Sequence, residues 1–186
     1  MEYAILPLLI VLNGVFAMSE VALLTARKAR LEKLVSEGDR SAVAALALGE
    51  NPNRFMSTIQ IGITSIGILN GIVGESAFAE PIAVWLQEVG VPQNWASGLA
   101  TALVVVVVTY ATIVVGELVP KRLGQINPES VARFVARPMS WLAMLSRPFV
   151  KLLSSSTDLA LRLLGVDPAT VQTVTEEEIH AMLAEG

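Results

Sequence analysis

The stretch WASGLATALVVVVVTYATIVVGELV, residues 95–119, decides the fold class of this chain. From Leu103 to Val108 it has no polar atom outside the backbone, and Glu117 is its one charged side chain. About 20 predominantly apolar residues are enough to cross the hydrocarbon core of a bilayer as a helix. This stretch therefore predicts a membrane-spanning helix.

Two further apolar stretches have a similar length, at residues 3–26 and 55–79. The second of these is the more polar, because it carries Ser57, Gln60, Thr64, Ser65 and Asn70. Polar side chains are costly in lipid, so we expect this helix to pack inside the protein. The sequence thus predicts an all-α, polytopic membrane protein with three transmembrane helices in contact with the lipid bilayer, joined to cytoplasmic juxtamembrane helices.

The basic residues orient these spans. All 13 lysines and arginines fall in two blocks, Arg27–Arg54 and Lys121–Arg162. The positive-inside rule places both blocks in the cytoplasm. We therefore expect a protein of the cell (inner) membrane, with its N-terminus outside, its C-terminus in the cytoplasm and an outside loop at residues 80–94. A fourth span at 138–164 is disfavoured, because it would bury four charged side chains in hydrocarbon.

The composition narrows the function. The chain of 186 residues is 53% hydrophobic and 16% charged, with a mean hydropathy of +0.61. Its net charge of −4 argues against a nucleic-acid partner. It has no cysteine, and its single histidine, His180, lies in a polar tail. A thiolate or histidine metal site and a Ser–His–Asp triad are therefore not expected, and we predict that the chain is not an enzyme.

The polar segments suggest three regions. Residues 1–120 form the predicted transmembrane domain, in which 27–50 is a cytoplasmic helical hairpin or a long amphipathic helix interrupted at Gly38. Residues 121–173 form a predicted juxtamembrane helical bundle, with helix breaks at four prolines: Pro120, Pro128, Pro138 and Pro148. Residues 174–186 begin a helix through a capping box at Thr175 and Glu178. We expect this last segment to lead into a further cytoplasmic domain.

Polar groups in the predicted spans are the candidate functional residues. They are Asn13, Ser19 and Glu20 in the first span, Asn70 and the other polar residues of the second, and Tyr110 and Glu117 in the third. Pro120 has no N–H, so it leaves the Gly116 carbonyl without its helical partner. A free carbonyl, the Glu117 carboxylate and a helix C-terminus together favour a cation site. The alternative is a proline stop signal with Glu117 paired to Lys121.

The second span carries a polar stripe. Its members, spaced by 4, 3, 4, 3 and 4, are Asn53, Ser57, Gln60, Thr64, Gly67 and Gly71. Gly67 and Gly71 form a GxxxG motif, so helix packing is one interpretation of the stripe. Asn70 lies near mid-span between glycines, where a helix can unwind and present carbonyl oxygens. All the candidate groups are oxygen donors, which suit Mg²⁺, Ca²⁺ or Na⁺.

Three motifs in this order, SEVAL (19–23), STIQIGIT (57–64) and GELVPK (116–121), resemble the transmembrane module of the CorC/cyclin-M (CNNM) magnesium transporters. The resemblance covers nearly the whole chain, and VTEEEI (174–179) resembles the linker to that family's CBS domains. It implies a homodimer that exports Mg²⁺, coupled to Na⁺ influx by alternating access and regulated by a CBS-like domain.

Carried over residue by residue, the resemblance implies cation ligands at Ser19, Ser65, Gly67, Asn70, Gly116 and Glu117. Many relatives have asparagines directly after the glycine matching Gly62, where this chain has Ile63-Thr64-Ser65. This departure affects the ligand positions that the resemblance implies in the second span. Two other functions stay open: a membrane Mg²⁺ sensor that does not transport, and an exporter of another cation such as a polyamine.

Overall fold

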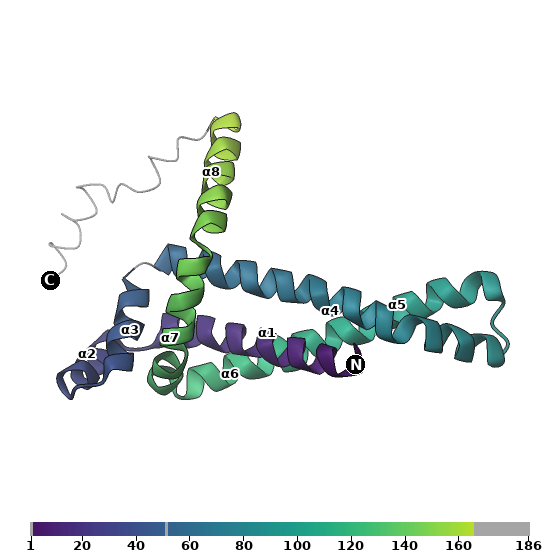
Figure 1. Ribbon diagram of the computed structural model, residues 1–186, viewed down its shortest axis with the longest axis horizontal. Helices are drawn as coiled ribbons and strands as arrows, with labels where there is room; N and C mark the ends of the chain where they lie inside the picture. Colours follow the sequence, from purple (N-terminus) through teal and green to yellow (C-terminus); the bar gives the residue numbers. More distant parts are fainter. Residues whose placement is uncertain (1, 51, 166–186) are drawn as a thin grey trace, which may run out of the picture. The chain divides into compact units, whose positions relative to one another are not determined.

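A computed structural model describes residues 2–50 and 52–165 of the chain (Figure 1). The described residues are helical and contain no strand. The chain divides into two compact units, residues 1–145 and 146–186. The predicted linker at 174–186, with its capping box at Thr175, lies outside the described residues.

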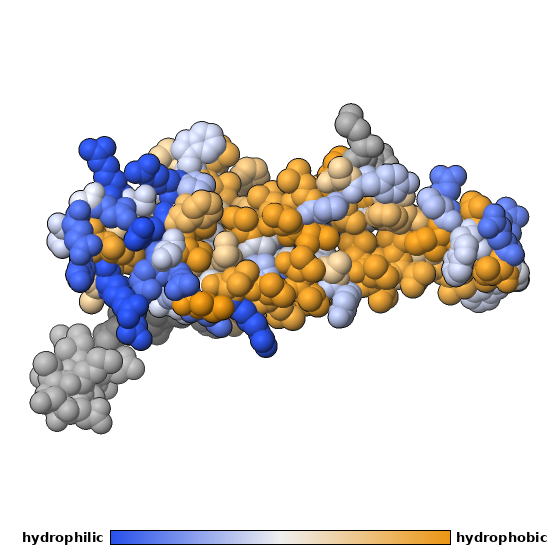
Figure 2. Space-filling model, turned by 90° about the horizontal axis from the view of Figure 1, so that it is seen from below, coloured by the Kyte–Doolittle hydropathy of each residue, from blue (hydrophilic) through white to orange (hydrophobic). Residues whose placement is uncertain are grey.

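Three long helices form the body of the first unit: α1 (Glu2–Thr25), α4 (Pro52–Glu88) and α5 (Gln93–Ile113), which lie side by side in Figure 1. In the described residues, three segments are long and apolar enough to cross a membrane: Tyr3–Thr25, Phe55–Glu88 and Gln93–Ile126. Hydrophobic residues cover this part of the unit, and hydrophilic residues gather toward its two ends (Figure 2). The predicted all-α, three-span fold is confirmed.

The second span is longer than expected, because α4 continues through Pro81 to Glu88. Ile82, beyond the proline, packs with a buried apolar cluster of Leu6, Ile10, Val104 and Val108. This packing gives the helix a reason to continue past a residue that removes one of its hydrogen bonds. The loop expected at residues 80–94 is therefore mostly helical, and the turn to α5 is short and passes through Gly90, whose φ is 97°.

The third span also continues where a break was expected. A π-helical turn, η1 (Val114–Leu118), joins α5 to α6 (Val119–Ile126), so the helix does not stop at Pro120. In this turn the Val119 N–H donates to the Val114 carbonyl, five residues earlier. A π-bulge is one way in which a helix accommodates a disruption of its regular hydrogen bonds. The turn contains both Gly116 and Glu117 of the GELVPK motif.

Residues 27–50 form a helical hairpin, made of α2 (Lys28–Ser36) and α3 (Arg40–Gly49). Gly38 makes the bend with a φ of 92°, in the left-handed region that favours glycine. Asp39 then caps α3, because its carboxylate accepts from the backbone N–H groups of Ser41 at 2.7 Å and Ala42 at 3.3 Å. Of the two readings of this segment, the structure shows the hairpin.

Helix α7 (Pro128–Leu145) begins at one expected proline and passes through another, Pro138. It packs against α3 and α1, and Val135 is buried in the same apolar cluster as Phe16 and Ile59. Arg133 of α7 pairs with Asp39 at 2.9 Å, which ties the helix to the hairpin. The proline inside α7 is tolerated within this packed region rather than ending the helix.

The second unit begins with α8 (Arg147–Leu163), which has Pro148 in its first turn as expected. It is not among the candidate spans found in the described residues. None of its residues is buried.

Candidate cation site

The Gly116 carbonyl has a partner in α1. The amide of Asn13 donates to it at 2.9 Å, and Asn13 is almost completely buried. The proline at position 120 cannot supply the usual helical donor, so a side chain from another helix supplies one instead. This carbonyl was expected to be free for a cation. In this conformation it is hydrogen-bonded to Asn13, and only its second lone pair remains for a ligand.

Glycines let α1 approach the helix that carries η1 and α6. A Cβ at Gly116 would lie 3.1 Å from the Ile10 carbonyl oxygen, and one at Gly124 would lie 2.8 Å from the Met18 carbonyl oxygen. A Cβ at Gly14 of α1 would lie 2.9 Å from the Pro120 ring. Close backbone approach through small residues is typical of transmembrane helix packing. Gly116 thus has a packing role besides any role in binding a cation.

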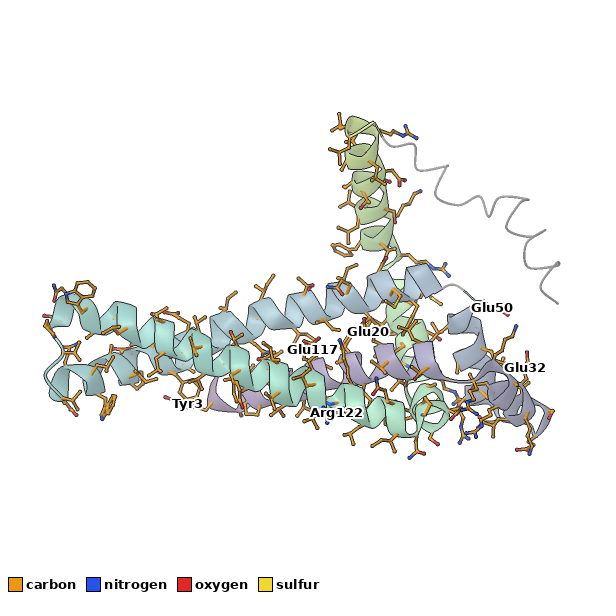
Figure 3. All side chains as sticks on the ribbon, turned by 180° about the vertical axis from the view of Figure 1, so that it is seen from behind. Tyr3, Glu20, Glu32, Glu50, Glu117 and Arg122 are labelled. Carbon is orange, nitrogen blue, oxygen red and sulfur yellow. The ribbon has the colours of Figure 1, made fainter. Side chains whose placement is uncertain are left out.

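Three charged side chains form a cluster between α1 and the third span. The Lys121 ammonium lies 2.9 Å from Glu117 and 3.3 Å from Glu20. Glu20 and Glu117 are labelled in Figure 3. Glu117 is 36% exposed and Glu20 is 16% exposed, so the cluster is partly open. The pairing of Glu117 with Lys121 at i, i+4, one of the two readings of the motif, is present. The structure adds Glu20 from a second helix, and the lysine therefore neutralises two carboxylates in part.

Ser19 precedes Glu20 in the chain and is fully buried. Its hydroxyl donates to the Val15 carbonyl at 2.6 Å, within the same helix. This hydrogen bond satisfies the buried hydroxyl and leaves its oxygen lone pairs as acceptors. α1 packs on η1, the turn that contains Glu117, and on α6.

Asn70 is the buried polar side chain that stands out in α4. It is 1% exposed, and neither its amide nitrogen nor its amide oxygen has a hydrogen-bond partner among the described residues. It lines a cavity of about 170 Å³ between α4 and α5, together with Gly67, Gly71, Thr109 and Thr112. The Thr112 hydroxyl is also buried without a partner in the described chain. Buried polar groups are nearly always paired, so these two groups are candidates for binding a ligand.

Several other members of the polar stripe on α4 are exposed, although Gly67 also lines that cavity. Gln60, Thr64 and Gly67 are exposed, and a Cβ at Gly67 or Gly71 would meet no atom within 4 Å. The second span was expected to pack inside the protein, but these three residues are exposed in the single chain. The reason is that α4 uses another face against α1, where Phe55, Ile59, Gly62 and Ile66 recur at helical spacing.

The six predicted ligand positions thus fall into three groups. Gly116 and Glu117 lie in η1, which packs on α1, the helix that carries Ser19, whereas Gly67 and Asn70 line the cavity with Thr112. Thr112 precedes Glu117 by five residues, which corresponds to roughly 7 Å along a helix. Ser65 is exposed on α4.

Sequence reasoning left Thr112 out of the predicted set and did not connect Asn13 to Gly116. A signal for both was present, because each is a polar residue in an otherwise apolar span. In the described residues no group of three His, Cys, Asp or Glu side chains could hold a metal ion. Any cation bound here would therefore need hydroxyl, amide or carbonyl oxygens besides the carboxylates.

The chain resembles known proteins along its whole length. Residues 4–186 match the family described as the cyclin M transmembrane N-terminal domain (CNNM). The UPF0053 protein sll0260 of Synechocystis is 45% identical over 186 residues, which cover all of this chain and 42% of that protein. The polyamine export protein of Salmonella typhimurium is 32% identical over 178 residues, covering 96% of this chain and 40% of that protein.

A third relative, the UPF0053 protein YhdP of Bacillus subtilis, is 28% identical over 184 residues, which cover 98% of this chain and 41% of that protein. The chain therefore spans about two fifths of the length of the curated relatives that it matches. The family match extends over nearly every residue, and the three candidate membrane spans agree with a transmembrane domain. The chain belongs to the cyclin M (CNNM) transmembrane domain family.

Proposed function

We propose that this chain is the transport domain of a Mg²⁺ exporter that is driven by Na⁺ influx through alternating access. Membership of the CNNM family and the three membrane spans support a membrane protein of transporter type. The choice of Mg²⁺ as cargo and of Na⁺ as the coupling ion rests on the resemblance and on the oxygen-only donor set.

The observation that carries the proposal is the unpaired, buried amide of Asn70. Leaving a polar group unpaired in hydrocarbon costs several kcal/mol per group, by order of magnitude. Such a group in a span is by default a functional candidate. Asn70 and Thr112 line the same cavity, and an amide oxygen and a hydroxyl are ligands of the kind that a hard cation accepts.

The carboxylates of Glu117 and Glu20 would supply negative charge to the site. Mg²⁺ gives up its hydration shell reluctantly, so negative charge near the site helps to offset that cost. Lys121 now sits between Glu117 and Glu20. In our proposal an incoming Mg²⁺ displaces this ammonium from Glu117, and Ser19 and the Gly116 carbonyl add further oxygens. The cation then passes between this site and the cavity at Asn70.

The orientation and the partners are part of the same proposal. The distribution of lysine and arginine supports an inner-membrane protein with its N-terminus outside and its C-terminus in the cytoplasm. The stripe residues Gln60, Thr64 and Gly67 are exposed in the single chain and offer a second copy a close-packing surface, which supports a homodimer. The greater length of the relatives supports a CBS-like regulatory domain in the whole protein.

The test is Mg²⁺ flux in proteoliposomes. Asn70→Ala and Glu117→Gln should each lower the rate at least tenfold, because each removes a proposed oxygen ligand. Matched controls are Asn94→Ala and Glu88→Gln, which make the same changes at exposed positions near the α4–α5 turn and should transport normally. If Asn70→Ala and Glu117→Gln both transport as fast as the unmodified chain, the proposed site is wrong.

Two observations favour a polyamine as a second candidate cargo. The cluster already binds one primary ammonium, that of Lys121, between two carboxylates. Another carboxylate, Glu75, is exposed within the second span, and a long polycation needs separated acidic groups. Relatives named polyamine export proteins match most of this chain. Spermidine flux measured in the same vesicles separates the two cargoes, and Mg²⁺ binding without flux of either would indicate a sensor.

A further inference from the structure

Helix α8 (Arg147–Leu163) has a surface unlike that of the other helices outside the spans. None of its residues is buried, and five of its large apolar side chains are half to four-fifths exposed, from Leu153 at 49% to Leu163 at 80%. Helices α2, α3 and α7 each bury apolar residues within the first unit. The apolar side of α8 is therefore a surface that needs a partner or an environment of its own.

The charges of α8 lie on one narrow side. With about 100° between successive residues, all four charged side chains fall within an arc of about 60°. They are Arg147, Lys151, Asp158 and Arg162, three cationic and one anionic. The opposite side, over an arc of about 140°, carries these apolar residues: Pro148, Phe149, Leu152, Leu153, Leu159, Ala160 and Leu163.

One polar residue, Ser156, lies in the middle of the apolar side. Its hydroxyl donates to the Leu152 carbonyl of the same helix at 2.9 Å. A hydroxyl that is already paired within its helix can enter an apolar medium at a lower cost than one that needs water. Ser154 lies almost opposite, next to the charged arc.

We propose that α8 lies in the plane of the membrane interface, with its apolar side among the acyl chains and Arg147, Lys151 and Arg162 on anionic lipid headgroups. A strongly amphipathic helix with basic residues on its polar side is the form that such interfacial helices take. Its 17 residues, four of them charged, are too few and too polar to span. The net positive charge of its polar side complements an anionic leaflet rather than this acidic chain, whose net charge is −4.

A second copy of the chain is the competing occupant. It would cover the apolar side with protein but would give the three cationic residues no complementary role. The proposal is independent of the cargo, because it concerns only the lipid contact of α8.

The chain has no cysteine, so single spin labels can be placed without removing any native residue. We would label Ser156→Cys and Ser154→Cys, the same residue type on opposite sides, in the full chain reconstituted in vesicles. Val106→Cys, at an exposed position of α5, reports that the chain is folded and inserted. Accessibility to oxygen, which enters lipid, is compared with accessibility to a water-soluble nickel complex.

In phosphatidylcholine vesicles with phosphatidylglycerol, the label at 156 should favour oxygen over nickel at least threefold more than the label at 154. Combining Arg147→Gln, Lys151→Gln and Arg162→Gln, or omitting phosphatidylglycerol, should reduce that contrast at least twofold. The proposal fails if 154 and 156 have equal accessibility while 106 favours oxygen. It also fails if the spin label at 156 shows short-distance coupling to the same label in a second copy. It fails as well if the accessibility contrast between 156 and 154 is the same with and without phosphatidylglycerol.

Discussion

Replacing Lys121 by methionine tests whether this ammonium competes with a cation for Glu117 and Glu20. Lys121 lies 2.9 Å and 3.3 Å from the two carboxylates, in contacts that an incoming cation must displace. Methionine keeps much of the length of the side chain and removes its charge. We therefore expect Lys121→Met to bind Mg²⁺ more tightly than the unmodified chain.

The size of the effect follows from the contacts. A hydrogen bond to a charged group contributes about 1.5–3 kcal/mol when it is protected from water. Lys121 is about a third exposed, and exposed ion pairs contribute about 0–1 kcal/mol. An intermediate figure of about 1–2 kcal/mol for both contacts together corresponds to a roughly 5- to 30-fold gain in affinity.

The assay is titration calorimetry with Mg²⁺ in detergent micelles, run beside Lys121→Arg and Arg122→Met. Arginine keeps the charge and should keep the affinity near that of the unmodified chain. Arg122 is exposed and makes no ion pair with any side chain that the structure describes, so Arg122→Met removes the same charge without freeing the carboxylates (Figure 3). Unchanged or weaker binding by Lys121→Met, or an equal gain with Arg122→Met, would refute the reasoning.

Two predictions concern folding. Gly62→Ala should destabilise the chain by about 1–3 kcal/mol, because its methyl group would collide with the Phe16 ring. Gly98→Ala, at an exposed position of α5 where a Cβ meets no atom within 4 Å, should not be destabilising. Unfolding in mixed micelles compares the two variants, and equal losses would contradict the packing described. The hydrogen bond from the Ser41 backbone N–H, above all, holds the pKa of Asp39 below its usual value of 3.8. The stability that the ionised Asp39 carboxylate contributes is therefore present above that value and is lost as the pH falls through the lower folded pKa. Thermal unfolding should show an acid-dependent loss that Asp39→Asn removes, and an identical pH profile in this variant would exclude Asp39 as its source.

The sequence was a good guide to the spans because each is a local property of about 20 consecutive residues. It was a weaker guide to where the helices end. The second span was expected to end at residue 79 and a break was expected at Pro120, yet Pro81 and Pro120 both lie inside continuous helices. In each case a tertiary contact favours continuation: Ile82 packs on the first and third spans, and the Pro120 ring packs on Gly14. No local pattern reveals such contacts.

The candidate site shows the same division. The sequence identified Glu117, Asn70 and Ser19 because polar groups stand out in apolar spans. It did not connect Asn13 with Gly116, or Glu20 with Lys121, because those contacts join residues about a hundred positions apart. It also predicted that the second span packs inside the protein, whereas Gln60, Thr64 and Gly67 are exposed in the single chain. Periodicity identifies a common face of a helix but not what that face meets.

Mg²⁺ export driven by an imposed inward Na⁺ gradient is the most direct test of the central claim. The chain is reconstituted with its cytoplasmic face inward, and the vesicles are loaded with Mg²⁺ and a fluorescent Mg²⁺ indicator. The proposal predicts that adding Na⁺ outside starts a loss of internal Mg²⁺ that choline does not start and that Asn70→Ala abolishes. A loss that is equal with Na⁺ and choline would contradict the coupling, and no loss beyond that of protein-free vesicles would contradict Mg²⁺ transport itself.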